Sequence, residues 1–412
     1  MKHTARGLAV LLACSTFSVT PMTAAAQTTR PALAGFSAER LDRIDELMQQ
    51  RIDQQWFPGA VTLVARNGRI VHFEAQGLMD IESERPMQND AVFRIMSMTK
   101  PIVAVAVLMM VEEGQMRLND PLSRFIPELG GLAVGADVGT SPASRGVRFD
   151  VTIRDVLTHT AGLMTRAGTN QPVIRIAPNE SLADVLPRLA GVSLDFEPGT
   201  RWAYSPQFGF DALVRAVEVA SGMPFGEFAE QRIFGPLSMD DTFFFPPEGH
   251  PRIATLYASV DGRLERREEQ DFVNGVYFSG GGGLFSTAED YLKFAMMLAN
   301  GGELDGTRFL GRKTVDLMRS AFIPDSLPGR TAGEGYGLGV RVVTDRTARN
   351  TLLSNGSFGW SGAFNTHFFI DPEEDIIGIF MTQSAFLATR QQLRDDFETA
   401  VMQALVDDTA TH

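Results

Sequence analysis

The segment Phe93-Arg94-Ile95-Met96-Ser97-Met98-Thr99-Lys100-Pro101 decides which fold and chemistry to expect of this chain. It joins a β-rich stretch to a long apolar helix, predicted over 98–113 and ended by Gly114, a common residue just after a helix. Ser97 therefore lies at a helix N-terminus, where free backbone N–H groups and the positive end of the helix dipole gather. Pro101 fits the first turn, because an N–H there has no intrahelical partner.

Ser97 and Lys100 form an S-x-x-K pair. Residues three apart share one helix face, so the Lys100 amine can reach the Ser97 hydroxyl. Serine is a weak nucleophile that needs an adjacent base, and a desolvated lysine can supply one. Lysine is scarce in this chain, so its presence here stands out. The alternative is a serine that only caps the helix, beside a solvated lysine.

No other catalytic motif competes with this pair. The sequence contains no H-E-x-x-H, no cysteine pair, no G-x-x-x-x-G-K-[ST] and no G-x-S-x-G. The glycine run 280–283 is not followed by a dinucleotide-binding pattern and is interpreted as a mobile loop. We therefore expect neither a metal ion nor an organic cofactor.

Strand-like patterns occur towards both ends of the chain and helical patterns between them. Two β-rich runs flank the turn Asn67-Gly68, a strong hairpin signal. The predicted strands cover 60–65, 69–75, 338–343, 363–370 and 376–381, and the predicted amphipathic helices cover 37–54 and 389–405. Capping boxes at 152–155 and 286–289 predict two further helix starts.

This order predicts an α+β fold with one antiparallel sheet built from both chain ends and flanked by helices. Residues 27–100 and 276–412 would form the sheet-containing lobe, and residues 101–275 a mostly helical lobe inserted into it. A crevice between two lobes is a natural place for a ligand.

Residues 1–26 are typical of an export signal. Lys2 and Arg6 precede a short apolar run, and Ala24-Ala25-Ala26 provides a small-residue cleavage site. We therefore expect an exported protein, periplasmic or secreted. Cys14, the only cysteine, ends a segment resembling a lipobox, so a lipid anchor is the alternative. No other apolar stretch is long enough to span a membrane.

The composition narrows the class of partner. Hydrophobic residues make up 44% and charged residues 21%, as is usual for a globular protein with a large core. The net charge is −13, and an acidic surface repels phosphate backbones, so nucleic acid is not an expected partner. A small-molecule ester or amide substrate is expected, and the sequence does not specify an oligomeric state.

The segment 93–101 resembles the nucleophile segment of the serine β-lactamase and penicillin-binding-protein superfamily. It is most similar to the class C β-lactamase-like branch, which includes family VIII carboxylesterases. Further similar segments follow in the same order along nearly the whole chain. They are 155–163 (similar to "LLTHTSGL"), Glu197-Pro198-Gly199 with Tyr204-Ser205, 233–239, 279–284, and Gly359-Trp360-Ser361-Gly362 where the family carries K-T-G, H-x-G or W-G-G.

The resemblance implies a role for each matching residue. Ser97 would be the acylated nucleophile, Lys100 would take or relay its proton, and Tyr204 would be a second acid/base whose phenolate is favoured by the Lys100 cation. Trp360, Ser361 and Gly362 would lie on the strand that edges the site. The backbone N–H groups of Ser97 and Ala363 would form an oxyanion hole, and glycine at 362 would let substrate approach the strand. His159 is expected to be structural.

Two departures from the family pattern affect specificity. The tyrosine motif reads Tyr204-Ser205-Pro206, so proline replaces the asparagine whose amide would grip a β-lactam or peptide. Trp360 replaces the K-T-G lysine that would pair with a substrate carboxylate. Both changes favour neutral, apolar acyl or alcohol groups, although an arginine elsewhere in the chain could restore carboxylate binding and with it weak β-lactamase activity.

The expected function is therefore that of a serine hydrolase cleaving esters with short or medium acyl chains through an acyl-enzyme. A β-lactamase, a D-Ala carboxypeptidase or an acyltransferase using the same site are alternatives. A non-catalytic binding or sensor domain on this scaffold is the alternative from another class.

Overall fold

The computed structural model describes residues 34–135, 145–166, 168, 172–268, 275–385 and 388–406. The export signal predicted over 1–26, with Cys14, lies outside the described residues, so export and lipid anchoring stay predictions. Within the described ranges, we find no helix with the length and apolar character needed to cross a membrane.

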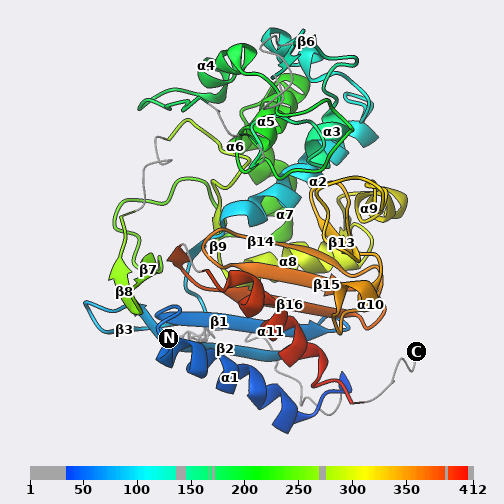
Figure 1. The fold of residues 1–412 in the computed structure, drawn as a ribbon. Coiled ribbons are helices and arrows are strands. Elements are labelled where there is room, and N and C mark those ends of the chain that lie inside the picture. Colours follow the sequence, from blue (N-terminus) through cyan, green and yellow to red (C-terminus); the bar gives the residue numbers. More distant parts are fainter. Residues whose placement is uncertain are drawn as a thin grey trace, which may run out of the picture.

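An eight-stranded antiparallel sheet forms the centre of the larger lobe (Figure 1). Its order is β12-β13-β14-β15-β16-β1-β2-β3, so β1 pairs with β16 from the other end of the sequence. The strands are β1 (Gly59–Arg66), β2 (Arg69–Asp80), β3 (Arg85–Pro86), β12 (Glu334–Tyr336), β13 (Arg341–Val343), β14 (Phe358–Ser361), β15 (His367–Asp371) and β16 (Ile376–Met381). This arrangement confirms the predicted α+β fold with one sheet built from both chain ends.

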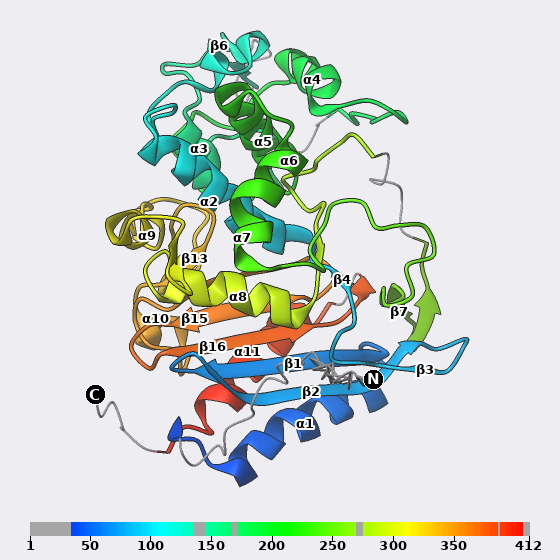
Figure 2. The same ribbon diagram turned by 180° about the vertical axis from the view of Figure 1, so that it is seen from behind.

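Helices cover both faces of this sheet, which explains why every residue of β1 is buried. One face packs on α1 (Ala38–Asp53) and α11 (Arg390–Met402), and the other on α8 (Ala288–Ala299), as Figures 1 and 2 show. Successive side chains of a strand point to opposite faces. Accordingly, Leu63 belongs to the larger hydrophobic cluster and Val64 to the cluster under α1 and α11.

Several local predictions are confirmed. The β1–β2 turn has positive φ at both Asn67 (50°) and Gly68 (71°), as the predicted hairpin requires. Helix α1 occupies nearly all of the predicted range 37–54, and the Ser37 side chain, which was not predicted to cap it, accepts from the Arg40 N–H. Thr152 and Asp155 form the predicted capping box at the start of α3 (Ile153–Leu157).

Three local predictions are wrong in detail. The predicted strand 363–370 begins only at His367, because the chain turns between β14 and β15 with Asn365 at positive φ. The predicted strand 338–343 begins at Arg341, because Gly339 also takes positive φ. The capping box at 286–289 is not formed: the N-cap of α8 is Thr287, which accepts from the Asp290 N–H.

The smaller lobe lies above the sheet in Figures 1 and 2, and its regular elements are mostly helices joined by long loops. Its helices are α3, α4 (Leu182–Val185), α5 (Phe208–Ser221), α6 (Phe225–Ala229) and α7 (Gly235–Leu237). Residues 101–275 also contain a hairpin of β7 (Tyr257–Val260) and β8 (Arg263–Arg266), which the sequence analysis did not predict and which pairs with β17 (Ser384–Ala385). The lobe boundaries given above stay predictions. The remaining α-helices and strands of the described residues are α2 (Thr99–Glu112), β4 (Phe93–Arg94), β5 (Ala133–Val134), β6 (Arg145–Gly146), β9 (Phe285–Ser286), β10 (Glu303–Leu304), β11 (Thr307–Arg308), α9 (Arg312–Met318) and α10 (Arg346–Arg349).

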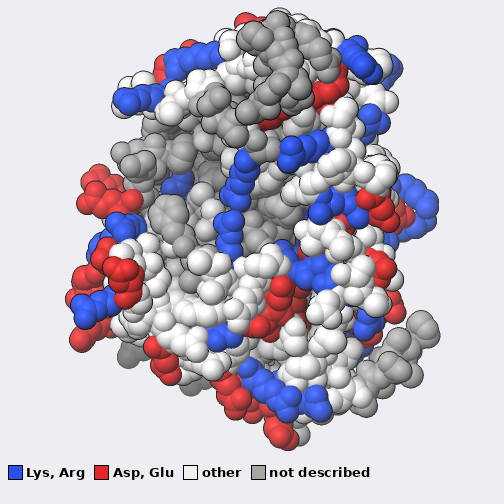
Figure 3. Space-filling model, viewed as in Figure 1, with Lys and Arg blue, Asp and Glu red and all other residues white. Residues whose placement is uncertain are grey.

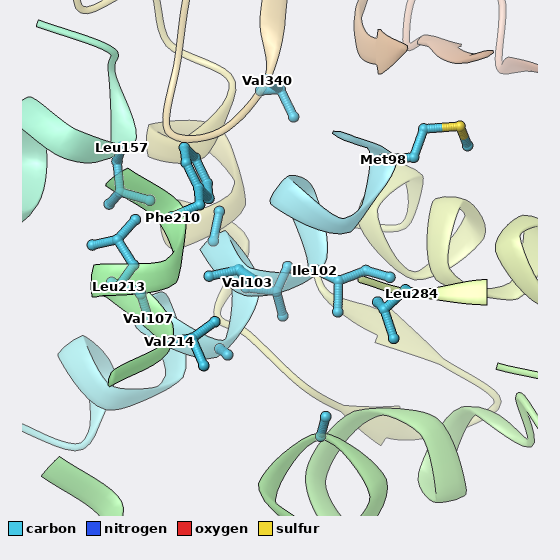
Figure 4. Close-up of a cluster of buried hydrophobic side chains, with 14 of the residues drawn as sticks. Met98, Ile102, Val103, Val107, Leu157, Phe210, Leu213, Val214, Leu284 and Val340 are labelled. Carbon is cyan, nitrogen blue, oxygen red and sulfur yellow. The ribbon is translucent and has the colours of Figure 1, made fainter. Parts of the chain in front are cut away.

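Helix α2 is the buried support of the site. Its residues from Thr99 to Met110 are all buried, as expected of a helix that is apolar all round. Figure 4 shows Ile102, Val103 and Val107 of α2 together with Phe210 and Leu213 of α5 in one hydrophobic cluster. Each such buried aliphatic side chain contributes about 1.5–3 kcal/mol, so the N-terminus of α2 is firmly placed.

Candidate active site

Ser97 lies in a tight turn immediately before α2. Strand β4 pairs with β9, the Ile95 N–H donates to Leu284 O, and the chain then enters a short 3₁₀ turn, Met96–Met98. Met96 has φ of +48°, an unfavourable value for a residue with a side chain, and such strain is characteristic of functional sites. The N-cap of α2 is Met98, and no side chain caps this helix, so Ser97 is not a helix cap.

The structure brings together the three side chains that the sequence singled out. The Tyr204 hydroxyl lies 2.6 Å from Ser97 Oγ. Lys100 Nζ lies 3.3 Å from the same oxygen. Ser97 is 7% exposed and Lys100 is fully buried, so this contact is made largely away from bulk water. The nucleophile, amine and phenol are therefore close enough to exchange protons.

Two backbone carbonyls hold Lys100 in place. Its ammonium donates to Pro206 O at 2.7 Å and to Gly281 O at 2.6 Å, in addition to Ser97 Oγ. These three acceptors match the three N–H bonds of an ammonium group. In the sequence Pro206 was notable only for the side-chain amide that it lacks, and no pattern predicted a role for its carbonyl.

The residues around Tyr204 lower the pKa of its hydroxyl. Burial of the hydroxyl acts to raise the pKa of Tyr204, but the charge of Lys100 and the hydrogen-bonding contacts with Lys100, Ser97 and Trp360 outweigh it, so the pKa is lowered from 10.0. Lys100 Nζ also lies 5.0 Å from the centre of the tyrosine ring. Tyr204 consequently loses its proton at lower pH than a free tyrosine does, and the resulting phenolate can accept a proton from Ser97.

His159 fixes the backbone on both sides of Tyr204. Its carbonyl accepts from the Ala203 N–H at 3.1 Å, and its Nδ1 accepts from the Ser205 N–H at 3.2 Å. Burial, with the nearby charge of Lys100, holds the pKa of His159 well below 6.5, so the ring is neutral. The ring also packs against Tyr204, with centroids 4.7 Å apart. These contacts fit the structural role expected of this histidine.

The glycine run 280–283 is not the mobile loop that the sequence analysis predicted. Buried Asp211 on α5 accepts hydrogen bonds from Tyr277, Ser279 and the Gly281 N–H, at 2.7, 2.9 and 3.0 Å. A Cβ on Gly280 would lie 2.4 Å from Phe210 O, so glycine is needed here for close packing. The loop is thereby held with the Gly281 carbonyl against Lys100.

Replacement of Asp211 tests this support. In Asp211→Ala, three buried donors lose their acceptor, and we expect the free energy of unfolding to fall by about 3 kcal/mol and kcat/KM for an ester to fall about 10-fold. Asp211→Asn is the matched control, because its remaining oxygen can still accept from Ser279 and Gly281. Thermal melts and ester kinetics measure both effects. An asparagine variant as impaired as the alanine variant would show that the charge of Asp211 is required and that its hydrogen bonds alone do not hold the loop.

The end of β14 forms the other side of the site. Trp360 and Ser361 are its last residues, followed by Gly362 and Ala363. A Cβ on Gly362 would lie 2.4 Å from Ile95 O, the carbonyl two residues before the nucleophile. The close approach observed at Gly362 is thus made by the protein's own atoms, Ile95 O and the Thr366 hydroxyl, whereas the sequence assigned it to substrate. The Thr366 hydroxyl also donates to Ile95 O at 2.9 Å.

These contacts fasten the β14–β15 turn to the nucleophile segment. The Gly362 N–H donates to Thr366 O, whereas the Ala363 N–H has no hydrogen-bond acceptor within the described ranges. The Ser361 hydroxyl lies 2.9 Å from His367 Nδ1. Ala363 therefore keeps a donor for a ligand on the side of the site where the sequence analysis expected an oxyanion hole.

A cavity of about 490 Å³ adjoins these groups. Ser97, Tyr204 and residues 360–363 line it. It is also lined by residues that the sequence analysis did not single out, namely Arg166, Arg201, Trp202, Arg390 and Arg394. Arg166 and Arg201 lie in loops and Arg390 and Arg394 on α11, and no sequence pattern links these separate segments, so no sequence signal could have found this set. Nowhere in the described ranges do three or more His, Cys, Asp or Glu side chains form a group that could hold a metal ion.

The fold and this site together define a serine hydrolase with a β-lactamase-like architecture. The family model described as Beta-lactamase matches residues 44–402, and the chain belongs to this family. Protein Rv1367c of Mycobacterium tuberculosis is 33% identical over 370 residues, 83% of this chain and 90% of that protein. Esterase EstB of Burkholderia gladioli is 32% identical over 375 residues, 84% of this chain and 90% of that protein. The solved structure of EstCE1, described as a hydrolase with promiscuous acyltransferase activity, superposes with a TM-score of 0.74 at 26% identity, covering 88% of this chain and 99% of that one.

Proposed function

We propose that this protein hydrolyses carboxylic esters with short or medium acyl chains through an acyl-enzyme on Ser97. The observation that carries the proposal is the position of Ser97 Oγ, 2.6 Å from the Tyr204 hydroxyl and 3.3 Å from Lys100 Nζ, at the wall of the cavity. The similarity to an esterase and to a hydrolase supports it.

The proposed chemistry assigns proton transfer to Tyr204 and charge support to Lys100. As the Ser97 oxygen attacks the ester carbonyl carbon, its proton passes to the Tyr204 oxygen, and the carbonyl oxygen becomes negative. The N–H groups of Ser97 and Ala363 would stabilise that oxygen, and such donors are typically worth about 2.7–4 kcal/mol each. Tyr204 then protonates the departing alcohol. Attack by water with the same proton transfers releases the acid.

The walls of the site favour esters over β-lactams. Trp360 and Trp202 present aromatic surface to the cavity, and Trp360 occupies the place of the family's K-T-G lysine. Pro206 offers no side-chain amide, and its carbonyl is already used by Lys100. A cavity of about 490 Å³ accommodates a small ester.

Acyl transfer is the second candidate, because EstCE1 is described as having promiscuous acyltransferase activity. An acyl-enzyme can yield its acyl group to an alcohol or amine as well as to water. Adding an alcohol acceptor and analysing the products separates the two outcomes, since a transferase forms the new ester in preference to the free acid.

A substrate panel tests the proposal. We expect p-nitrophenyl acetate and butyrate to be hydrolysed with kcat/KM at least about 10-fold above that for a chromogenic cephalosporin, because Pro206 and Trp360 replace the asparagine and the K-T-G lysine that position a β-lactam in the family. A fluorophosphonate probe should label Ser97. Faster turnover of the cephalosporin would favour a β-lactamase, and the absence of both turnover and label would favour a binding domain.

A further inference from the structure

We infer that the cavity beside Ser97 selects esters carrying a negatively charged oxygen group, and that Arg166, Arg201 and Arg390 recognise that group. This inference rests on the proposed ester hydrolysis and narrows its substrate class. The simplest such substrate is a half-ester, in which one carboxyl group of a dicarboxylic acid is esterified and the other is free.

The charge of the cavity lining is opposite to that of the whole protein. The chain carries 50 acidic and 37 basic residues. Nevertheless, every charged side chain that lines the cavity within the described ranges is an arginine, at positions 166, 201, 390 and 394. A cleft lined by one sign of charge raises the local concentration of ligands of the opposite sign. Figure 3 shows basic side chains running along the hollow between the two lobes.

Three of the four arginines have no ion pair within the described ranges. Arg394 is already paired, with Asp395 at 3.3 Å and Glu334 at 3.5 Å. Arg166, Arg201 and Arg390 are exposed and make no such contact with a described carboxylate. Their guanidinium groups therefore remain available for an anion, for which their planar forks are well suited.

Arg166 places positive charge very near the reacting atoms. Its guanidinium carbon lies 5.1 Å from the centre of the Tyr204 ring, and the hydroxyl of that ring contacts Ser97. A substrate with its carbonyl at Ser97 would therefore need only a short spacer to reach Arg166. Arg390 is the first residue of α11, whose first turn lines the same cavity and adds the partial positive charge of a helix N-terminus.

This arrangement changes the specificity expected from the sequence. Loss of the K-T-G lysine at Trp360 predicted a preference for neutral groups, but these arginines supply positive charge from other segments of the chain. The alternative is that the arginines are ordinary surface residues that affect no substrate, and kinetics distinguish the two.

The test compares two esters of equal chain length, the p-nitrophenyl monoester of glutarate and p-nitrophenyl pentanoate. We expect wild type to favour the glutarate ester, and the ratio of the two kcat/KM values to fall about 5-fold in each of Arg166→Gln, Arg201→Gln and Arg390→Gln. The ratio should also fall with added NaCl, because salt screens exposed charges. Arg312→Gln, which removes an exposed arginine outside the cavity, should keep the wild-type ratio.

A wild-type ratio at or below one, unchanged in the three variants, overturns the inference. If neither ester is hydrolysed, the proposed function fails. Binding measurements then test on their own whether the arginines recognise an anionic group. Calorimetry with Ser97→Ala should show tighter binding of monoethyl glutarate than of ethyl pentanoate, and the added Arg166→Gln change should remove the difference. Equal binding of the two esters would again overturn it.

Discussion

Replacement of Ser97 by alanine is expected to lower kcat for p-nitrophenyl butyrate by roughly 10⁴-fold or more, as loss of an attacking serine does in other hydrolases. The Ser97 oxygen is the atom that both Tyr204 and Lys100 contact, so its removal takes away the group that would form the acyl-enzyme. The side chain is small and 7% exposed, so the alanine variant should fold normally. Intact-mass analysis after brief exposure to the ester should detect an acyl adduct on wild type and none on the variant.

The matched control is Ser320→Ala. Ser320 is exposed, is not among the residues that line the cavity, and its hydroxyl donates to Asp316 O. We expect it to keep wild-type kinetics and a wild-type melting temperature. Turnover by Ser97→Ala close to that of wild type would contradict the assignment of the nucleophile.

Replacement of Lys100 by methionine is expected to have the second-largest effect, a fall in kcat/KM of about 10³-fold, within the range for loss of acid–base catalysis. The charge and hydrogen bond of Lys100 lower the pKa of Tyr204, whereas burial acts to raise it. Without Lys100 the burial effect is opposed only by the hydrogen bonds with Ser97 and Trp360, so the pKa of Tyr204 should rise. If Tyr204 acts as a phenolate, the rising limb of the pH–rate profile should lie below pH 10 in wild type and move to more alkaline pH in the variant.

The pH dependence of kcat/KM, rather than the activity at one pH, is the decisive measurement. Lys100→Met also leaves Pro206 O and Gly281 O without their donor, so we expect a loss of about 1–3 kcal/mol in the free energy of unfolding. A thermal melt shows whether the variant is folded at the assay temperature. Lys313→Met, at an exposed lysine, is the control for lysine loss. A variant whose pH limb stays at the wild-type position would contradict the proposed coupling.

Those parts of the fold that depend on local patterns could be predicted from the sequence. The Asn67-Gly68 hairpin and the Thr152–Asp155 capping box each depend on a few neighbouring residues, and both are confirmed. The antiparallel sheet from both chain ends followed from the order of the strand patterns. The proximity of Ser97 and Lys100 followed from helix spacing, whereas the place of Tyr204 came from family resemblance.

Features created by tertiary contacts could not be predicted. The glycine run 280–283 has the composition of a mobile loop, and only the position of Asp211 on another segment makes it rigid. Neither Pro206 nor Gly281 has a sequence signal for a carbonyl directed at Lys100. Gly362 was correctly marked as a position of close approach, but the group that approaches it, Ile95 O, is distant in sequence.

The pairing of β1 with β16 also bears on when the site comes into existence during synthesis. The nucleophile segment is made early, yet the strand that would carry the oxyanion donor is joined to the sheet through β15 and β16, which are made late. Contacts between segments so distant in the sequence form slowly, because the entropy of closing the long intervening loop must be overcome first. A nascent or still-extended polypeptide would hold Ser97 without its partner strand, and would therefore be inert towards esters until its final strands had joined the sheet.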